Sequence, residues 1–184
     1  MAHLKRTFFG MLILSLMVLL SPNQASSKSA DEINAEVNQA LDTLYAQSSA
    51  AREIGAKAYG ILVFPHITKG GFIVGGEYGE GALRVGGKTQ AYYSSASGSV
   101  GFQIGISSRS LVIMFLTDGA LKQFTTADGW EAGVNADVTV IDTGATGSID
   151  TTTAQRPVIA FNFGEKGLMA GVSVEGTKVS KIQR

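Results

Sequence analysis

The residues with the most recognisable spacing for chemistry lie between Ala82 and Thr89. The run Ala-Leu-Arg-Val-Gly-Gly-Lys-Thr fits a loosened nucleotide-binding loop, in which backbone N–H groups and Lys88 would surround a phosphate at the start of a helix. The residues that follow, 90–95, read as a strand instead. A two-residue hairpin turn at Gly86 and Gly87 explains the segment better, so we predict that no nucleotide binds here.

Other catalytic patterns are weaker still. Ser173 lies in a Gly-Val-Ser-Val-Glu run that lacks the last glycine of a nucleophile elbow, and His66 is the one histidine beyond the N-terminal segment. A single histidine also disfavours a zinc site. A pair of carboxylates for acid–base chemistry is the open alternative, but spacing selects none of them, and most stand beside glycines in expected turns. They are Glu77, Glu80, Asp118, Asp128, Glu131, Asp137, Asp142, Asp150, Glu165 and Glu175. We predict no enzyme activity and no cofactor or metal.

Basic residues give the remaining chemistry. Lys57, Lys69, Arg84 and Lys88 flank a glycine-rich stretch from Tyr59 to Lys88. If its turns converge, these cations could meet anionic lipid headgroups, each contributing about 1 kcal/mol near a charged surface. Three C-terminal cations could act in the same way, and solvated single charges are the alternative. These are Lys178, Lys181 and Arg184.

Composition limits the class of protein. The chain has 184 residues, enough for one domain with a substantial core, and its 45% hydrophobic content is too high for a disordered chain. Its 23 glycines without a collagen-like repeat indicate a turn-rich β protein. Beyond residue 27 there are thirteen basic and fifteen acidic side chains, a net charge near −2. Nucleic-acid binding calls for a concentrated basic surface, so we predict none.

The first 27 residues have the layout of a secretory signal peptide. Lys5 and Arg6 precede an apolar run from Phe8 to Leu20, and small polar residues follow. The run is shorter than the ~20 residues of a membrane span, although an uncleaved anchor is the alternative. The chain contains no cysteine, which excludes disulfides and a cysteine-linked lipid. We therefore expect a protein exported to the periplasm or cell envelope.

Helices are expected before the glycine-rich stretch. Ser29 and Glu32 form a capping-box pattern that predicts a helix from Ser29 to Gln47. Its apolar residues fall on one stripe, typical of a face packed on the core, while its polar face is acidic. The stripe is Ile33, Val37, Leu41, Leu44 and Tyr45. A second short helix is expected at Ala50–Ala58, so residues 28–58 form a helical lead-in.

Short strands dominate residues 59–184. Ile61–Phe64 and Phe72–Val74 have strand composition, with Pro65 expected to stop the first run. Asp118–Ala127 should form a helix between strands, and Trp130 should fill the core. The other expected strands are 90–95, 99–107, 110–117, 132–142, 143–150, 157–163, 168–174 and 177–182. We predict an α+β fold: one domain over residues 28–184, with a strongly curved or barrel-like antiparallel sheet.

The amino-acid sequence of the glycine-rich stretch resembles that of a known family. Val63-Phe-Pro-x-Ile-Thr-Lys-x-Gly-Phe-Ile-Val-Gly-Gly-Glu-Tyr-Gly-Glu-Gly81 is similar to the opening motif of the SYLF domain family. Five further segments match the family in order, so the resemblance extends from about Arg52 to the C-terminus. They are Ser97–Gly105, Leu111–Leu116, Gly129–Gly133 (with Phe124 before it), Gly144–Gly147 and Gly167–Gly176.

The resemblance implies lipid binding without established catalysis. Eukaryotic members bind phosphoinositides, and fungal members also bind actin. With its signal peptide, this chain looks like a bacterial exported member, for which we expect binding to anionic phospholipid or a membrane surface through Lys57, Lys69, Arg84 and Lys88. The alternative is a periplasmic structural or scaffolding protein that binds protein partners at its sheet edges.

Overall fold

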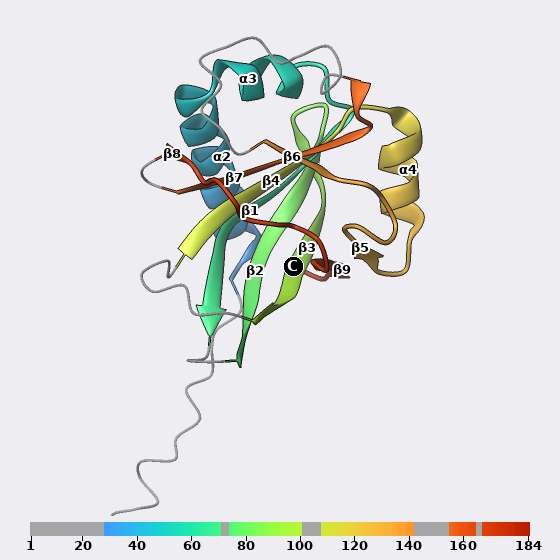
Figure 1. Ribbon diagram of the computed structural model, residues 1–184. Helices are drawn as coiled ribbons and strands as arrows, with labels where there is room; N and C mark the ends of the chain where they lie inside the picture. The colour runs from blue at the N-terminus through green and yellow to red at the C-terminus, as the bar shows by residue number, and fades with distance from the viewer. Residues whose placement is uncertain (1–27, 71–73, 101–107, 142–154, 165–166) are drawn as a thin grey trace, which may run out of the picture.

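The computed structural model describes residues 28–70, 74–100, 108–141, 155–164 and 167–184. Within these ranges the chain forms three helices and one nine-stranded sheet (Figure 1). The helices are α2 (Ala30–Gln47), α3 (Ser49–Gly55) and α4 (Asp118–Thr126). The strands are β1 (Gly60–Gly70), β2 (Val74–Val85), β3 (Lys88–Val100), β4 (Ser108–Phe115), β5 (Trp130–Glu131), β6 (Thr139–Ile141), β7 (Val158–Gly164), β8 (Gly167–Leu168) and β9 (Lys178–Ile182).

The sheet is strongly curved and almost entirely antiparallel. Its strand order is β5-β9-β3-β2-β1-β4-β7-β6, with β8 paired to β7. The pair β6–β7 is parallel, and the other pairs are antiparallel. Together with the N-terminal helices and the short helix after β4, this arrangement confirms the predicted α+β fold class (Figure 1).

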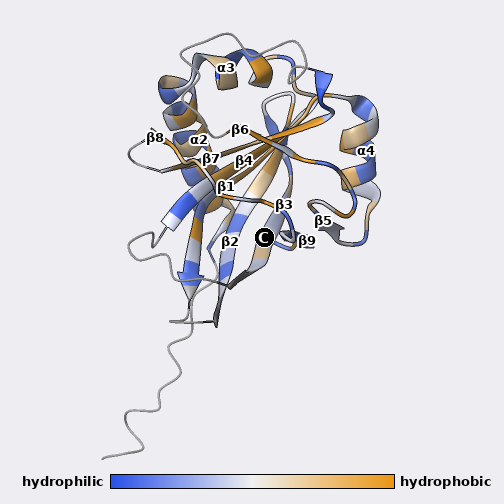
Figure 2. Ribbon diagram, in the orientation of Figure 1, coloured by the Kyte–Doolittle hydropathy of each residue, from blue (hydrophilic) through white to orange (hydrophobic). Residues whose placement is uncertain are grey.

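Two apolar clusters lie on opposite faces of the sheet. On one face, Ile33, Val37 and Leu44 of α2 pack against strand residues such as Val63 and Ala82. On the other, Phe124 of α4 and Trp130 pack around Phe115, with ring centroids of Phe115 and Phe124 4.8 Å apart. Figure 2 shows the apolar colour concentrated where helices cover the sheet, and hydrophilic residues at the far ends of β1 and β2. The predicted core roles of the α2 stripe and of Trp130 are confirmed.

The start of α2 follows its predicted capping box. The Glu32 N–H donates to the Ser29 hydroxyl, and the Ser29 N–H donates to the Glu32 carboxylate at 2.7 Å. The Ser29 backbone bond, and then the Ser29 hydroxyl, lower the pKa of Glu32 because both favour its ionised form. The predicted helix and its cap are thus both present.

Pro65 does not stop β1, contrary to the prediction. The strand continues to Gly70, and its register shifts between Val63 and His66 against β2 and between Phe64 and Ile67 against β4. A bulge therefore accommodates the missing N–H of proline inside the strand.

Glycines of β2 make room for this bulge. A Cβ on Gly81 would lie 1.9 Å from the carbonyl oxygen of Val63, and one on Gly79 would lie 2.7 Å from that of His66. Side chains at these two positions would collide with the backbone of β1. Their glycines are needed for close approach of two strands.

Other predicted elements differ in extent. Within residues 132–141, the described part of the strand expected at 132–142, only 139–141 form a strand, because residues 133–135 form a turn that begins at Gly133 with a φ of 82°. In place of the strand expected at 168–174, β8 ends at Leu168 and a turn follows at residues 170–171. The strand expected at 143–150, and most of that at 99–107, lie outside the described residues.

Every described helix and strand lies beyond residue 27, and so do the described members of the two apolar clusters. Where the structure describes the chain, none of its helices combines the length and apolarity needed to cross a membrane. The expected signal peptide and its boundary fall outside the described residues and stay predictions.

Candidate functional site

Three of the four predicted lipid-contact cations lie at one end of the sheet. Gly86 and Gly87 connect β2 to β3 with φ values of 57° and 78°, as a tight two-residue hairpin requires, which confirms the predicted turn. Arg84 and Lys88 flank this turn. Lys57 precedes β1, whose residue Ile61 pairs with Arg84, so it belongs to the same end. We call this region the hairpin end.

The hairpin end also displays an aromatic residue. Tyr59 is 53% exposed, although its backbone N–H is fixed by a 2.8 Å hydrogen bond to the carbonyl of Phe115. Lys57 and Lys88 are exposed as well. An exposed tyrosine whose backbone is hydrogen-bonded to a neighbouring strand, at the same end of the sheet as two exposed lysines, is suited to an interface between water and an apolar phase.

Arg84 is held by α2 and is less available than the two lysines. Its guanidinium donates to the Asn38 side chain at 2.7 Å and to the backbone carbonyl of Asn34 at 3.4 Å. The Asn34 side chain in turn accepts from Thr89 and donates to Tyr92. This network fixes the hairpin against the helix, so Arg84 positions the hairpin end.

Lys69 lies at the opposite end of β1. It pairs in register with Glu77, whereas the hairpin end is reached at Ile61, eight residues earlier. At ~3.3 Å per strand residue the two ends are roughly 26 Å apart. The structure therefore does not bring Lys69 together with Lys57, Arg84 and Lys88.

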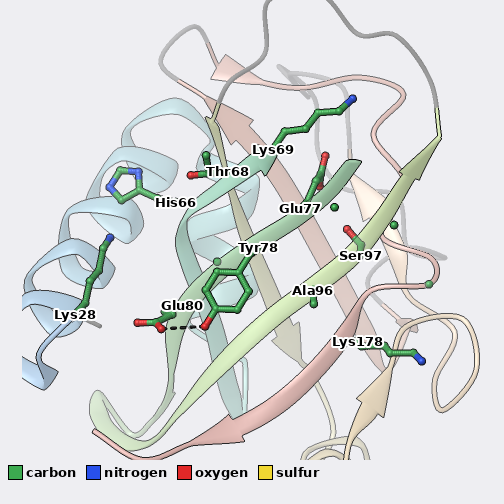
Figure 3. Close-up of a pocket in the computed structure, with 14 residues that line it drawn as sticks. Lys28, His66, Thr68, Lys69, Glu77, Tyr78, Glu80, Ala96, Ser97 and Lys178 are labelled. Carbon is green, nitrogen blue, oxygen red and sulfur yellow. Dashed lines mark hydrogen bonds between the residues drawn. The ribbon is translucent and has the colours of Figure 1, made fainter. Parts of the chain in front are cut away.

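The far end of the sheet contains an open hollow of about 1000 Å³ that the sequence did not predict (Figure 3). Its lining combines cations, carboxylates and hydroxyls over a floor of glycines and Ala96. Tyr78 stands in it, 52% exposed, and donates a 2.9 Å hydrogen bond to Glu80. Burial, and then the bond to Glu80, raise the pKa of Tyr78 above 10.0. The same Glu80 oxygen is paired with Arg184.

A buried polar network lies beside this hollow. Arg109, 6% exposed, donates to Glu77 at 2.7 Å and to the side chain of Asn162, which is fully buried. Asn162 donates to the carbonyl of Val172 at 3.1 Å. Arg109 was not singled out from the sequence, although a charged residue near the start of an otherwise apolar strand could have indicated a buried polar contact. The ion pair with Arg109 compensates the negative charge of Glu77, one of the two carboxylates that line the hollow.

His66 and Ser173, two of the residues considered for catalysis, have different surroundings, while Asp142, Asp150 and Glu165 lie outside the described residues. His66 is exposed on β1 and pairs in register with Glu80, and the Ser173 hydroxyl accepts a 3.0 Å bond from the backbone of Glu175, as in a turn. No cluster of three or more metal-ligating side chains occurs in the parts of the chain that the structure describes.

Fold and surface together define a small α+β protein whose contacts with other molecules would be made by displayed charges and an exposed aromatic ring. The family model described as "Ysc84: Las17-binding protein actin regulator" matches residues 96–184, from β3 to Arg184. This match over residues 96–184 supports the resemblance to the SYLF domain family that the sequence predicted. The motif between Val63 and Gly81 precedes the matched residues. No curated protein matches the chain.

Proposed function

We propose that this protein is a non-catalytic lipid-binding module of the bacterial cell envelope, which associates with anionic phospholipid through its hairpin end. The observation that carries this proposal is the display of Lys57, Tyr59 and Lys88 together at one end of a rigid sheet. The match to the SYLF family supports a binding function.

The expected contributions are modest and additive. Lys57 and Lys88 would each contribute about 1 kcal/mol near an anionic surface, and together about 2 kcal/mol, or roughly a thirtyfold change in affinity at low salt. Tyr59 would place its ring at the headgroup level, where amphipathic aromatic side chains are enriched. Arg84 would act by holding the hairpin in place.

Export is part of the same proposal. The basic start and the apolar run from Phe8 to Leu20 support secretion into the periplasm or cell envelope. Fractionation of cells that express the full chain tests this directly: the processed chain should be released with periplasmic and envelope proteins. Recovery of the unprocessed chain in the cytoplasm would contradict export.

Vesicle co-sedimentation tests the lipid contact. The chain from Gln24 onward, which contains every described element, is mixed at low salt with vesicles that contain phosphatidylglycerol. Lys57→Ala with Lys88→Ala should weaken binding about thirtyfold. Lys122→Ala with Lys181→Ala removes the same charge from α4 and β9 and should leave binding near that of the parent chain. Equal binding by the two double variants would refute the hairpin end as the contact.

A second candidate function is a structural or scaffolding role with a protein partner. The description of the matching family names binding to the protein Las17, which supports protein recognition as a property of the family. Within the described residues, β9 covers only Tyr92–Ala96 of β3, so residues 88–91 lie at a sheet edge that could accept a further strand. Crosslinking in intact cells that captures one protein, with no vesicle binding, would favour this function.

A further inference from the structure

Within the described residues, the hollow lies on the sheet face that α2 covers elsewhere. Ala82 packs in the α2 cluster, and because side chains alternate along a strand, Glu80 and Tyr78 point to the same side as Ala82. Past the bulge in β1, His66 and Thr68 pair with Glu80 and Tyr78. Figure 3 shows His66 and Thr68 on β1 and Tyr78 and Glu80 on β2, next to the helix.

One carboxylate oxygen of Glu80 is buried without a hydrogen-bond partner. Its side chain is only 10% exposed, and one carboxylate oxygen, Oε1, accepts from both Tyr78 and Arg184. The other oxygen, Oε2, is buried and has no hydrogen-bond partner. Removing a carboxylate oxygen from water without giving it a hydrogen-bond donor costs free energy. A positively charged donor forms the strongest hydrogen bond to such an oxygen. Among the described residues, Oε2 therefore lacks a donor, although Oε1 is paired with Arg184.

Lys28 and His66 line the hollow together with Glu80. His66 is its register partner on β1, about 5 Å away at Cβ, and Lys28 extends along the same side of the hollow (Figure 3). The Lys28 ammonium is bound by both oxygens of Glu36, which fixes its position and leaves one N–H for a further acceptor. The hollow thus offers an anionic and a cationic partner side by side.

We propose that the hollow binds a phosphate ester of a primary amino alcohol, with the N–H-bearing ammonium group at Glu80 and the phosphate group at Lys28 and His66. The exposed ring of Tyr78 beside Glu80 adds a surface that attracts a cation. The ammonium and phosphate of such an ester are separated by a two-carbon link, which suits neighbouring strands about 4.8 Å apart. This site lies far from the hairpin end and does not depend on the proposed contact there.

Calorimetric titration with soluble headgroups tests the proposal. The chain from Gln24 onward is used, so that no new terminal charge adjoins Lys28. Glycerophosphoethanolamine should bind saturably and at least tenfold more tightly than glycerol phosphate, which lacks the ammonium. Equal affinity for the two compounds would overturn the proposal. So would the absence of binding both to the soluble compounds and to vesicles that contain phosphatidylethanolamine.

Two variants separate the two halves of the site. Glu80→Gln should reduce the affinity for glycerophosphoethanolamine at least tenfold and leave that for glycerol phosphate unchanged, whereas Lys28→Gln should weaken both. Glu175→Gln, an exposed carboxylate outside the hollow, is the control for charge. If Glu80→Gln unfolds the chain, Lys28→Gln alone still tests the site. Weaker binding of both glycerophosphoethanolamine and glycerol phosphate to Lys28→Gln would support the site, and unchanged affinities for the two compounds would refute it.

Vesicles distinguish the source of the ligand. Vesicles of phosphatidylcholine with added phosphatidylethanolamine should bind the parent chain, and Glu80→Gln should abolish this gain, if the ligand is a lipid headgroup. Binding of the soluble ester without any gain on these vesicles identifies a free phosphate ester. Because Lys57→Ala with Lys88→Ala leaves the hollow intact, failure of the hairpin contact and failure of this site can be told apart.

Discussion

Substitution of Gly81 gives the sharpest test of how β1 and β2 fit together. A Cβ at this position would lie 1.9 Å from the Val63 carbonyl oxygen and 2.8 Å from its carbonyl carbon, whereas ordinary contact begins at 3.4 Å. Gly81→Ala therefore requires the two strands to separate by about 1.5 Å at the bulge, because the obstructing atoms belong to the backbone. Side-chain rotation cannot relieve the collision.

The magnitude follows from two opposing effects. Overpacking of this kind costs about 3 kcal/mol, at the upper end of the usual range, because strand pairing is disturbed. Alanine restricts the unfolded chain and recovers up to about 1 kcal/mol. The net loss in the free energy of unfolding should be about 2 kcal/mol, which corresponds to roughly 4–8 °C in Tm for a domain of this size.

Urea unfolding followed by circular dichroism measures this loss. Gly98→Ala is the matched control, since Gly98 lies in β3, has no positive φ, and an added Cβ there would meet nothing within 4 Å. We expect Gly98→Ala to be as stable as the parent chain or slightly more stable. A Gly81→Ala variant as stable as Gly98→Ala would refute the close approach of β1 and β2.

Two further predictions concern buried polar side chains. Arg109→Ala should lower the free energy of unfolding by about 3–5 kcal/mol in urea, because Glu77 and the fully buried Asn162 lose their partner. A loss no larger than that of Lys122→Ala, which removes an exposed ion pair, would contradict this prediction. Burial raises the pKa of Tyr93 above its ordinary 10.0, so its stabilising contribution is complete below pH 10 and is lost as pH rises through the higher folded value. Tyr93→Phe should flatten the loss of unfolding free energy above pH 10, and an unchanged alkaline slope would contradict the assignment.

Features determined by short segments of sequence were predictable. The stripe that includes Ile33, Val37 and Leu44 indicates a packed helix because its spacing follows the helical period. The structure buries these three residues fully and the other two members of the stripe partly. Gly86 and Gly87 predict a hairpin because two successive positive φ values favour glycine, and they have them. Both signals are local, so no knowledge of distant neighbours is needed.

Features that depend on neighbouring strands were not predictable in the same way. Pro65 normally ends a strand, yet here a bulge absorbs it, and the bulge fits because Gly79 and Gly81 face it from β2. The register that places His66 opposite Glu80 arises from the same shift. A single sequence shows each residue but not the pairing, so the hollow was missed.

The candidate lipid contact was partly predictable for the same reason. Lys57, Arg84 and Lys88 are brought to one end because two of them flank a hairpin and the third precedes the adjoining strand. Lys69 is close to them in the sequence but lies at the other end of an eleven-residue strand. The network of Arg84 with α2 depends on side-chain contacts between distant segments.

Binding of the unmodified chain to vesicles of different charge tests the central claim most directly. The chain from Gln24 onward is sedimented at low salt with vesicles of phosphatidylcholine alone and of phosphatidylcholine with phosphatidylglycerol. We predict binding to the anionic vesicles only, decreasing as salt is added because the contact is electrostatic. Equal sedimentation with both kinds of vesicle, or with neither, would contradict the proposed association with anionic phospholipid.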